Sequence, residues 1–190
     1  MTNLAVDFKG PFSWPKYEIE NGLPSLPKHP GLYLQAADYK EGYVVYLAGL
    51  TRRPLIVRFK EHGNKYMKGE YSVLDMAAMR QGKRLEVWHG WGWTAEKRAL
   101  FEHGQQFVTD AVHKQLRDFR IFVADVDTKG RILERLEAAI MMHLYNQPPP
   151  FCNIPDRGMH LSSRWKSESP ITASVSASKK LYGLPEKFEL

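Results

Sequence analysis

Cysteine is nearly absent from this sequence, with Cys152 as the single example among 190 residues. One cysteine excludes an intrachain disulfide and a cysteine-rich zinc site, and it fits a reducing cytoplasm. No uninterrupted apolar stretch reaches the roughly 18 residues that a membrane-spanning helix needs. The N-terminal residues also lack the basic and then apolar pattern of a secretion signal. We therefore expect a cytoplasmic protein with no membrane partner.

Several short motifs that mark common functional classes are missing as well. The chain has no Walker loop, no dinucleotide fingerprint and no His-Glu-x-x-His zinc motif. It has no zinc finger and no obvious helix-turn-helix, so a separate DNA-recognition module is not indicated. Hydrophobic residues make up 43% of the chain, which is enough to build a core and excludes disorder over most of it.

Positive charge is concentrated in one short segment. The formal charge is +6, and residues 51–68 contain six Lys or Arg against one Glu. A Ser-rich C-terminal arm, residues 157–190, adds six positive against three negative side chains. Such clustering suits a polyanion such as nucleic acid, although a solvated basic helix would carry the same charge. The side chains that we assign to DNA phosphates are Arg52, Arg53, Lys60, Lys65 and Lys68.

The first third of the chain predicts a lead-in segment, a hairpin and a helix. Residues 1–30 hold five of the twelve prolines, so we expect residues 1–29 to wrap over the surface. Two β-prone runs, 31–36 and 43–49, flank a polar turn and predict a β-hairpin. A helix then begins at Pro54 and runs to about residue 63.

The rest of the chain predicts alternating helices and strands. We expect a short helix at 71–82, a strand at 84–89, a long helix from the N-cap Thr94 to about residue 116, and a strand at 119–126. After a turn at 127–130, a strongly patterned helix covers 131–145 and stops before a run of prolines. The expected fold is α/β, with a small, partly antiparallel sheet flanked by helices.

Five short features stand in one order along the chain. They are a Gly-hydrophobic-Tyr triplet, a Tyr-hydrophobic-Ala triplet followed by glycine, an Arg-x-x-x-His pair, a Leu-Glu-x-x-Ile sequence and an asparagine after a proline turn. This order resembles the GIY-YIG nuclease family over roughly residues 30–154. In the second triplet the glycine comes one position later than in that family. The residues that match are Tyr33, Tyr46, Arg58, His62, Glu137 and Asn153.

The resemblance implies a domain organisation and an activity. The nuclease-like domain would cover residues 30–156, with insertions at about 66–118. It implies a metal-dependent DNA endonuclease that uses Mg²⁺, with Mn²⁺ able to substitute, and acts on double-stranded DNA. Glu137 would hold the metal and Arg58 the scissile phosphate. Restriction, repair and mobile-element enzymes share these motifs, and the compact chain favours a restriction-type enzyme.

The resemblance also implies roles for the remaining residues. Tyr33 would activate or orient the attacking water, and Tyr46 would hold that water or a phosphate oxygen. A phenol with a pKa near 10 is a poor base unless a cation lowers that value. His62 would position Tyr33 or assist proton transfer, and Asn153 would tether the end of the helix or the phosphate.

Glu137 can be placed independently of the family by the pattern of its helix. Taking 100° per residue, Glu137 lies about 80° and Glu134 about 140° from the centre of the apolar stripe. Glu137 is therefore the carboxylate at the rim of the core. Glu134 should be solvated and pair with Arg131 or Arg135. The alternative for Glu137 is an ordinary salt bridge at the edge of the core.

Several alternatives stay open. A module that binds nucleic acid without cutting it would share the same motifs, and the displaced glycine favours that alternative. Trp88, Trp91 and Trp93 could stack on bases, or they could pack as a turn under the long helix. One set of site residues means one active site per chain, so cutting both strands requires a homodimer, at least on DNA, or two successive encounters.

Overall fold

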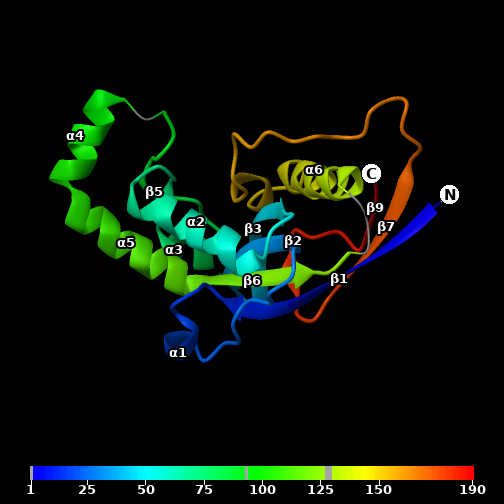
Figure 1. The fold of residues 1–190 in the computed structure, drawn as a ribbon, viewed down its shortest axis with the longest axis horizontal. Helices are drawn as coiled ribbons and strands as arrows, with labels where there is room; N and C mark the ends of the chain where they lie inside the picture. The colour runs from blue at the N-terminus through cyan, green and yellow to red at the C-terminus, as the bar shows by residue number, and fades with distance from the viewer. Residues whose placement is uncertain (1, 93, 127–129) are drawn as a thin grey trace.

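The computed structural model describes residues 2–92, 94–126 and 130–190. Across these residues, one mixed seven-stranded sheet curls into a half-barrel with the strand order β8-β3-β2-β6-β1-β7-β9 (Figure 1). The α/β prediction is confirmed, but the prediction of a small sheet is wrong. The strands are β1 (Thr2–Ser13), β2 (Gly31–Tyr39), β3 (Gly42–Thr51), β6 (Phe119–Ala124), β7 (Ile171–Ala177), β8 (Leu181–Tyr182) and β9 (Lys187–Glu189).

The extra strands come from the two ends of the chain. The predicted lead-in contains β1, which lies inside the sheet between β6 and β7 instead of wrapping over the surface. Val6 and Phe8 are buried there while Ala5 and Asp7 are exposed, which is the alternation of a strand. β7 runs parallel to β1, from Asn3 opposite Thr172 to Phe8 opposite Ala177. The C-terminal arm is therefore part of the sheet.

The predicted hairpin is confirmed as the antiparallel pair β2 and β3. The register is regular from Gly31 opposite Thr51 to Gln35 opposite Leu47, and then shifts at a bulge before Ala36. A bulge inserts one residue into a strand and changes which side chains face each other beyond it. Tyr46 is the residue at this bulge, between the pairs of Leu47 and Val45.

Two helices border the concave side of the molecule (Figure 1). The helix α2 (Leu55–Met67) begins after Pro54 as expected and extends past the predicted end. The helix α6 (Arg131–Tyr145) has the bounds that the sequence predicts, and it buries Leu133, Leu136, Ile140 and Leu144. α6 packs against β2 and β3, so its rim residues face the strands of the hairpin.

The segment expected to be an insertion, residues 66–118, contains several small elements, and its last two helices extend from the body of the molecule (Figure 1). The long helix predicted from residue 94 is two helices, α4 (Ala95–His103) and α5 (Gln105–Asp118), because Gly104 interrupts it. The short helix predicted at 71–82 is the strand β4 (Val73–Leu74) followed by α3 (Met76–Arg80). β4 pairs with β5 (Glu86–Trp88) in a two-stranded sheet. The remaining helices are α1 (Glu18–Asn21) and the 3₁₀ turn η1 (Phe151–Asn153).

Within the described ranges, no helix combines the length and the apolar character required to cross a bilayer. Trp93 and the first three positions of the turn expected at 127–130 lie outside the described residues.

Candidate active site

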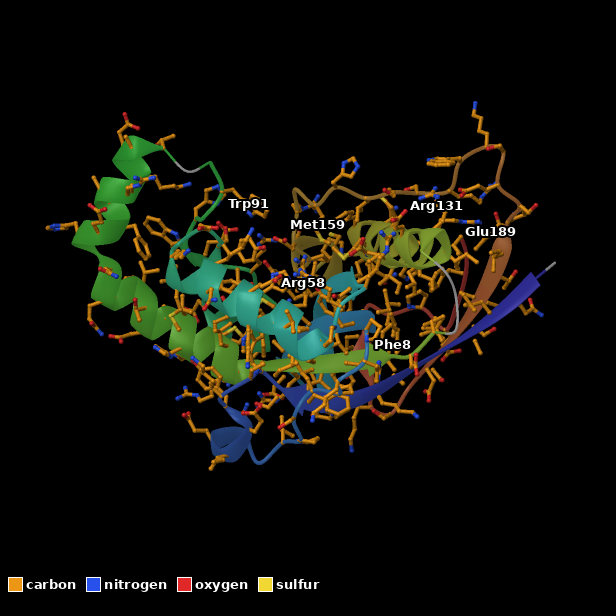
Figure 2. All side chains as sticks on the ribbon, viewed as in Figure 1. Phe8, Arg58, Trp91, Arg131, Met159 and Glu189 are labelled. Atoms are coloured by element: carbon orange, nitrogen blue, oxygen red, sulfur yellow. The ribbon has the colours of Figure 1, made fainter. Side chains whose placement is uncertain are left out.

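A cleft of about 440 Å³ opens where α2 and α6 meet the hairpin. Figure 2 shows Arg58 on α2, Trp91 on the loop before α4 and Met159 beyond η1 around this part of the molecule. The fold thus gathers residues that lie more than a hundred positions apart in the chain. Five of the six predicted catalytic residues line the cleft, namely Tyr33, Tyr46, Arg58, His62 and Glu137.

Tyr33 lies at the buried floor of the cleft, with only 2% of its surface exposed. Its hydroxyl oxygen is 3.1 Å from Nε2 of His62, and its ring packs edge-on against Phe59. Burial raises the pKa of Tyr33 to about 12, against the opposing effect of Arg58. The phenol is therefore neutral near pH 7 and can donate its proton.

Gly49 leaves the space that the Tyr33 ring occupies. The two residues face each other across the hairpin. A Cβ at position 49 would lie 2.4 Å from Cζ of Tyr33, closer than real contacts allow. The bulge lies at Tyr46, three residues before this glycine, and the pairs from Leu47 to Gly49 are regular. The displaced glycine of the second triplet is thus the one that accommodates Tyr33.

Arg58 and His62 are one turn apart on α2, and both face the cleft. Burial, together with Arg58 and Lys65, lowers the pKa of His62 to about 3, so the imidazole is neutral near pH 7 and one ring nitrogen can accept a hydrogen bond. Among the described residues Arg58 makes one ion pair, a long one of 3.9 Å from its NH1 to Glu61, and it also acts on the Tyr33 phenol through its charge and a side-chain hydrogen bond. Its Nε is buried and has no hydrogen-bond partner among the described residues. The guanidinium therefore keeps donors available for an anion.

Glu137 is half-buried and differs clearly from Glu134. Its Oε1 accepts a hydrogen bond of 3.1 Å from the backbone N–H of Leu50, and burial raises its pKa to about 7. Among the described residues it forms no ion pair, which the salt-bridge alternative would require. Glu134 does pair, at 2.6 Å with Arg52 and 3.6 Å with Arg131. Glu134 thus pairs with Arg131 as its position on the helix predicts, and it lines the cleft together with Glu137.

The donor set around Glu137 suits one hard divalent cation. No group of three His, Cys, Asp or Glu able to hold a metal occurs among the described residues. Mg²⁺ commonly takes one or two protein carboxylates and completes its shell with water and substrate phosphate. The half-buried carboxylate of Glu137, with one oxygen held by a backbone donor, fits that requirement.

Tyr46 is held by residues that the sequence did not indicate. Its hydroxyl donates to Oδ1 of Asp156 at 3.0 Å, and the backbone N–H of Asp156 donates to the Tyr46 carbonyl at 2.9 Å. NH2 of Arg84 lies 3.6 Å from Asp156, and the guanidinium sits 5.6 Å from the centre of the Tyr46 ring. Burial raises the pKa of Asp156 and that of Tyr46. Only the tyrosine of this cluster belongs to a motif.

Asn153 is the predicted residue that the fold does not bring to the cleft. It is exposed on η1, and its side-chain oxygen lies 3.6 Å from Sγ of Cys152. The nearby Asp156 lines the cleft in its place.

The basic segment divides into paired and unpaired cations. Arg52 pairs with Glu134, and Arg53 makes two hydrogen bonds of 2.6 and 2.7 Å to Glu61. Lys60, Lys65 and Lys68 are exposed and form no ion pair with any described residue. The cations best placed to meet an anion from this segment are therefore the three lysines and Arg58.

The tryptophans that the sequence groups together have different environments. Trp88 is half-buried, with its Nε1 donating to the carbonyl of Gly69 at 2.8 Å and its ring beside Phe101. Of the two alternatives for the tryptophans, packing or stacking on bases, these contacts correspond to packing for Trp88. Trp91 is 44% exposed and lines the cleft.

No family model, curated protein or solved structure matches the chain. The resemblance to GIY-YIG nucleases consequently rests on the residues of the motifs.

Proposed function

We propose that the chain is a divalent-metal-dependent endonuclease that hydrolyses phosphodiester bonds of double-stranded DNA and resembles the GIY-YIG family. The observation that carries the proposal is one cleft that holds Tyr33, Arg58, His62 and Glu137 together. These residues come from three different elements, β2, α2 and α6, and the fold brings their polar groups to one cleft. An anion-binding arginine, a neutral phenol with an acceptor behind it and a free carboxylate are the groups that phosphoryl hydrolysis requires.

In this proposal Arg58 binds the scissile phosphate. Its buried Nε has no partner among the described residues, and a phosphate oxygen can supply one. The positive charge would stabilise the negative charge that grows on the phosphate in the transition state. Lys60, Lys65 and Lys68 would contact neighbouring phosphates and add a salt-dependent part of the affinity.

The proton of the attacking water would leave through Tyr33. The water oxygen forms a bond to phosphorus while the bond from phosphorus to the 3′ oxygen breaks. The water proton passes to Tyr33 as the phenol passes its own proton to His62, 3.1 Å away. Burial and the charge of Arg58 lower the pKa of His62 to about 3, so this step requires the bound phosphate, whose negative charge would favour the imidazolium. The released 3′ oxygen takes a proton from solvent. Tyr33 thereby never has to exist as a free phenolate, which its pKa of about 12 disfavours.

Tyr46 would orient the water, because its proton is already engaged. A phenol has one O–H, and Tyr46 donates it to Asp156. Toward the cleft its oxygen can therefore only accept a hydrogen bond. This assigns the two tyrosines different tasks, with Tyr33 in the proton path and Tyr46 as an acceptor for the water.

Glu137 would hold Mg²⁺, which when bound acts as a Lewis acid on the leaving oxygen. The carboxylate must be ionised to do so, and the nearby positive charge of Arg58 lowers its pKa while burial raises it. We favour a compact restriction-type role, with repair and mobile-element roles as alternatives.

Plasmid cleavage with Mg²⁺ tests this proposal. Glu137→Ala should reduce cleavage by at least about 10²–10³, the cost of losing a key electrostatic stabiliser, and should leave DNA binding largely intact. The matched control is Glu134→Ala, one turn away, which should cut at nearly the normal rate. Normal cutting by Glu137→Ala would refute the metal assignment.

A restriction-type dimer should convert supercoiled plasmid to linear product with little nicked intermediate.

A further inference from the structure

Trp91 and Tyr71 form an aromatic pair on one wall of the cleft. Their ring centres are 5.9 Å apart and their planes are inclined by 30°. Trp91 remains 44% exposed. A large apolar side chain left exposed in the wall of a cleft offers a stacking surface to a flat ligand.

This aromatic pair adjoins the groups assigned to the chemistry. The Tyr71 ring lies 5.6 Å from the ring of His62. Nζ of Lys65 lies 5.4 Å from the centre of the Tyr71 ring, on the side of the basic helix. These distances place His62 and Lys65 beside Tyr71, the residue on which Trp91 stacks, so a base that rests on Trp91 would lie on the wall of the cleft that also carries these two side chains.

The groups assigned to the chemistry lie below the protein surface, so a substrate has to enter the cleft to reach them. Tyr33 is 2% and His62 is 7% exposed, so the reacting phosphate has to enter the cleft. Cavities of about 300–1,000 Å³ hold small ligands, and the volume of about 440 Å³ lies within that range. Gln35 also lines the cleft, and its buried Oε1 has no hydrogen-bond partner among the described residues. The cleft therefore offers both a flat surface and an unfilled acceptor to whatever enters it.

We propose that one base of the cleaved DNA, on a nucleotide next to the scissile phosphate, leaves the helical stack and rests on Trp91. The inference depends on the proposed nuclease function and adds to it a single-nucleotide subsite. Met159, which also lines the cleft, supplies a further apolar contact. Because every base has an aromatic face, stacking of this kind assists cleavage without determining a base identity.

The first test compares substitutions of exposed tryptophans. Trp91→Ala should lower kcat/KM for plasmid cleavage about tenfold to a hundredfold, the range of base–aromatic stacking, and Trp91→Phe should recover most of it. The control is Trp165→Ala, whose indole is 62% exposed beside Arg131 and does not line the cleft. It should cut like the wild-type protein.

The second test reads the position of the base directly. In Glu137→Gln, which should bind without cutting, a duplex carrying 2-aminopurine beside the mapped cut should change fluorescence on binding. The double variant Glu137→Gln/Trp91→Ala should not give that change. If DNA is cut normally by Trp91→Ala, or the 2-aminopurine signal is the same in both variants, the subsite is refuted and the nuclease proposal stands. If the wild-type protein neither binds nor cuts DNA, both proposals fall.

Discussion

The raised pKa of Glu137 has a consequence for stability that can be measured without any DNA. Burial favours the neutral carboxyl, so the folded protein binds the proton of Glu137 more tightly than the unfolded chain does. Below the pKa that Glu137 has in the unfolded chain, the carboxyl is protonated in both states and burying it does not reduce the free energy of unfolding. As pH rises through the folded pKa of about 7, the carboxyl ionises in a half-buried position and stability is lost.

The size of this loss follows from the shift. The pKa moves from 4.5 to about 7. At about 1.4 kcal/mol per pKa unit, this corresponds to an upper figure of about 3 kcal/mol, lost mainly between the two pKa values. Water at the open side of the cleft solvates the carboxylate and makes the loss of stability smaller than this upper figure. Mg²⁺ at saturating concentration should recover stability at pH 8, because binding to the folded state alone adds RT ln(1 + [L]/Kd).

Urea unfolding in EDTA at pH 5 and at pH 8 measures the effect. We expect the wild-type protein to lose stability between the two values relative to Glu137→Gln, which has no charge to bury. Glu134→Gln keeps Glu137 and should retain most of the wild-type loss, because the charge of Glu134 is the smallest of the causes that shift the pKa of Glu137. An equal pH dependence in the wild-type protein and Glu137→Gln would show that the carboxyl is well solvated, and would remove the argument for a buried metal ligand.

Three further predictions address the rest of the site. Gly49→Ala should destabilise the protein by about 1–3 kcal/mol in urea unfolding and abolish cleavage, because the added Cβ would meet the Tyr33 ring. The pair Lys60→Ala and Lys68→Ala should reduce the slope of log binding constant against log salt by about 0.9 for each phosphate that the variant no longer neutralises. Asp156→Ala should lower kcat more than it raises KM, and Asp156→Asn should restore much of the rate because its carbonyl still accepts the hydrogen bond from the phenol.

The parts of the fold that the sequence predicts well are those whose patterns are local. The stripe of α6 repeats at helical spacing within fifteen residues, and its bounds were predicted to the residue. The hairpin is similarly local, because two β-prone runs and a short turn specify each other. The two elements carry Tyr33, Tyr46 and Glu137, half of the six predicted catalytic residues, and their local patterns explain why these three could be placed.

The strands at the chain ends were missed for an identifiable reason. The five prolines in the first thirty residues favour an irregular segment, whereas the alternation of Leu4, Val6 and Phe8 is the signal for β1. The partner strand β7 alternates buried Ile171 and Ala173 with more exposed neighbours, but small and hydroxylated residues weaken that pattern. Parallel pairing of two strands so distant in sequence leaves no local trace.

Supporting groups around the candidate active site leave even less trace than those strands. Groups that touch a phosphate or a water must have particular chemistry, which restricts position 58 to a cation and position 137 to a carboxylate. A group that only holds Tyr46 in place needs to accept one hydrogen bond, and many residue types in many places could do so. Asp156 is recognisable only once the bend after η1 brings its backbone N–H to the carbonyl of Tyr46 and its carboxylate to the phenol of that residue. The motifs thus contain the groups that we propose to react, while the group that holds Tyr46 in place comes from a C-terminal segment in which no motif occurs.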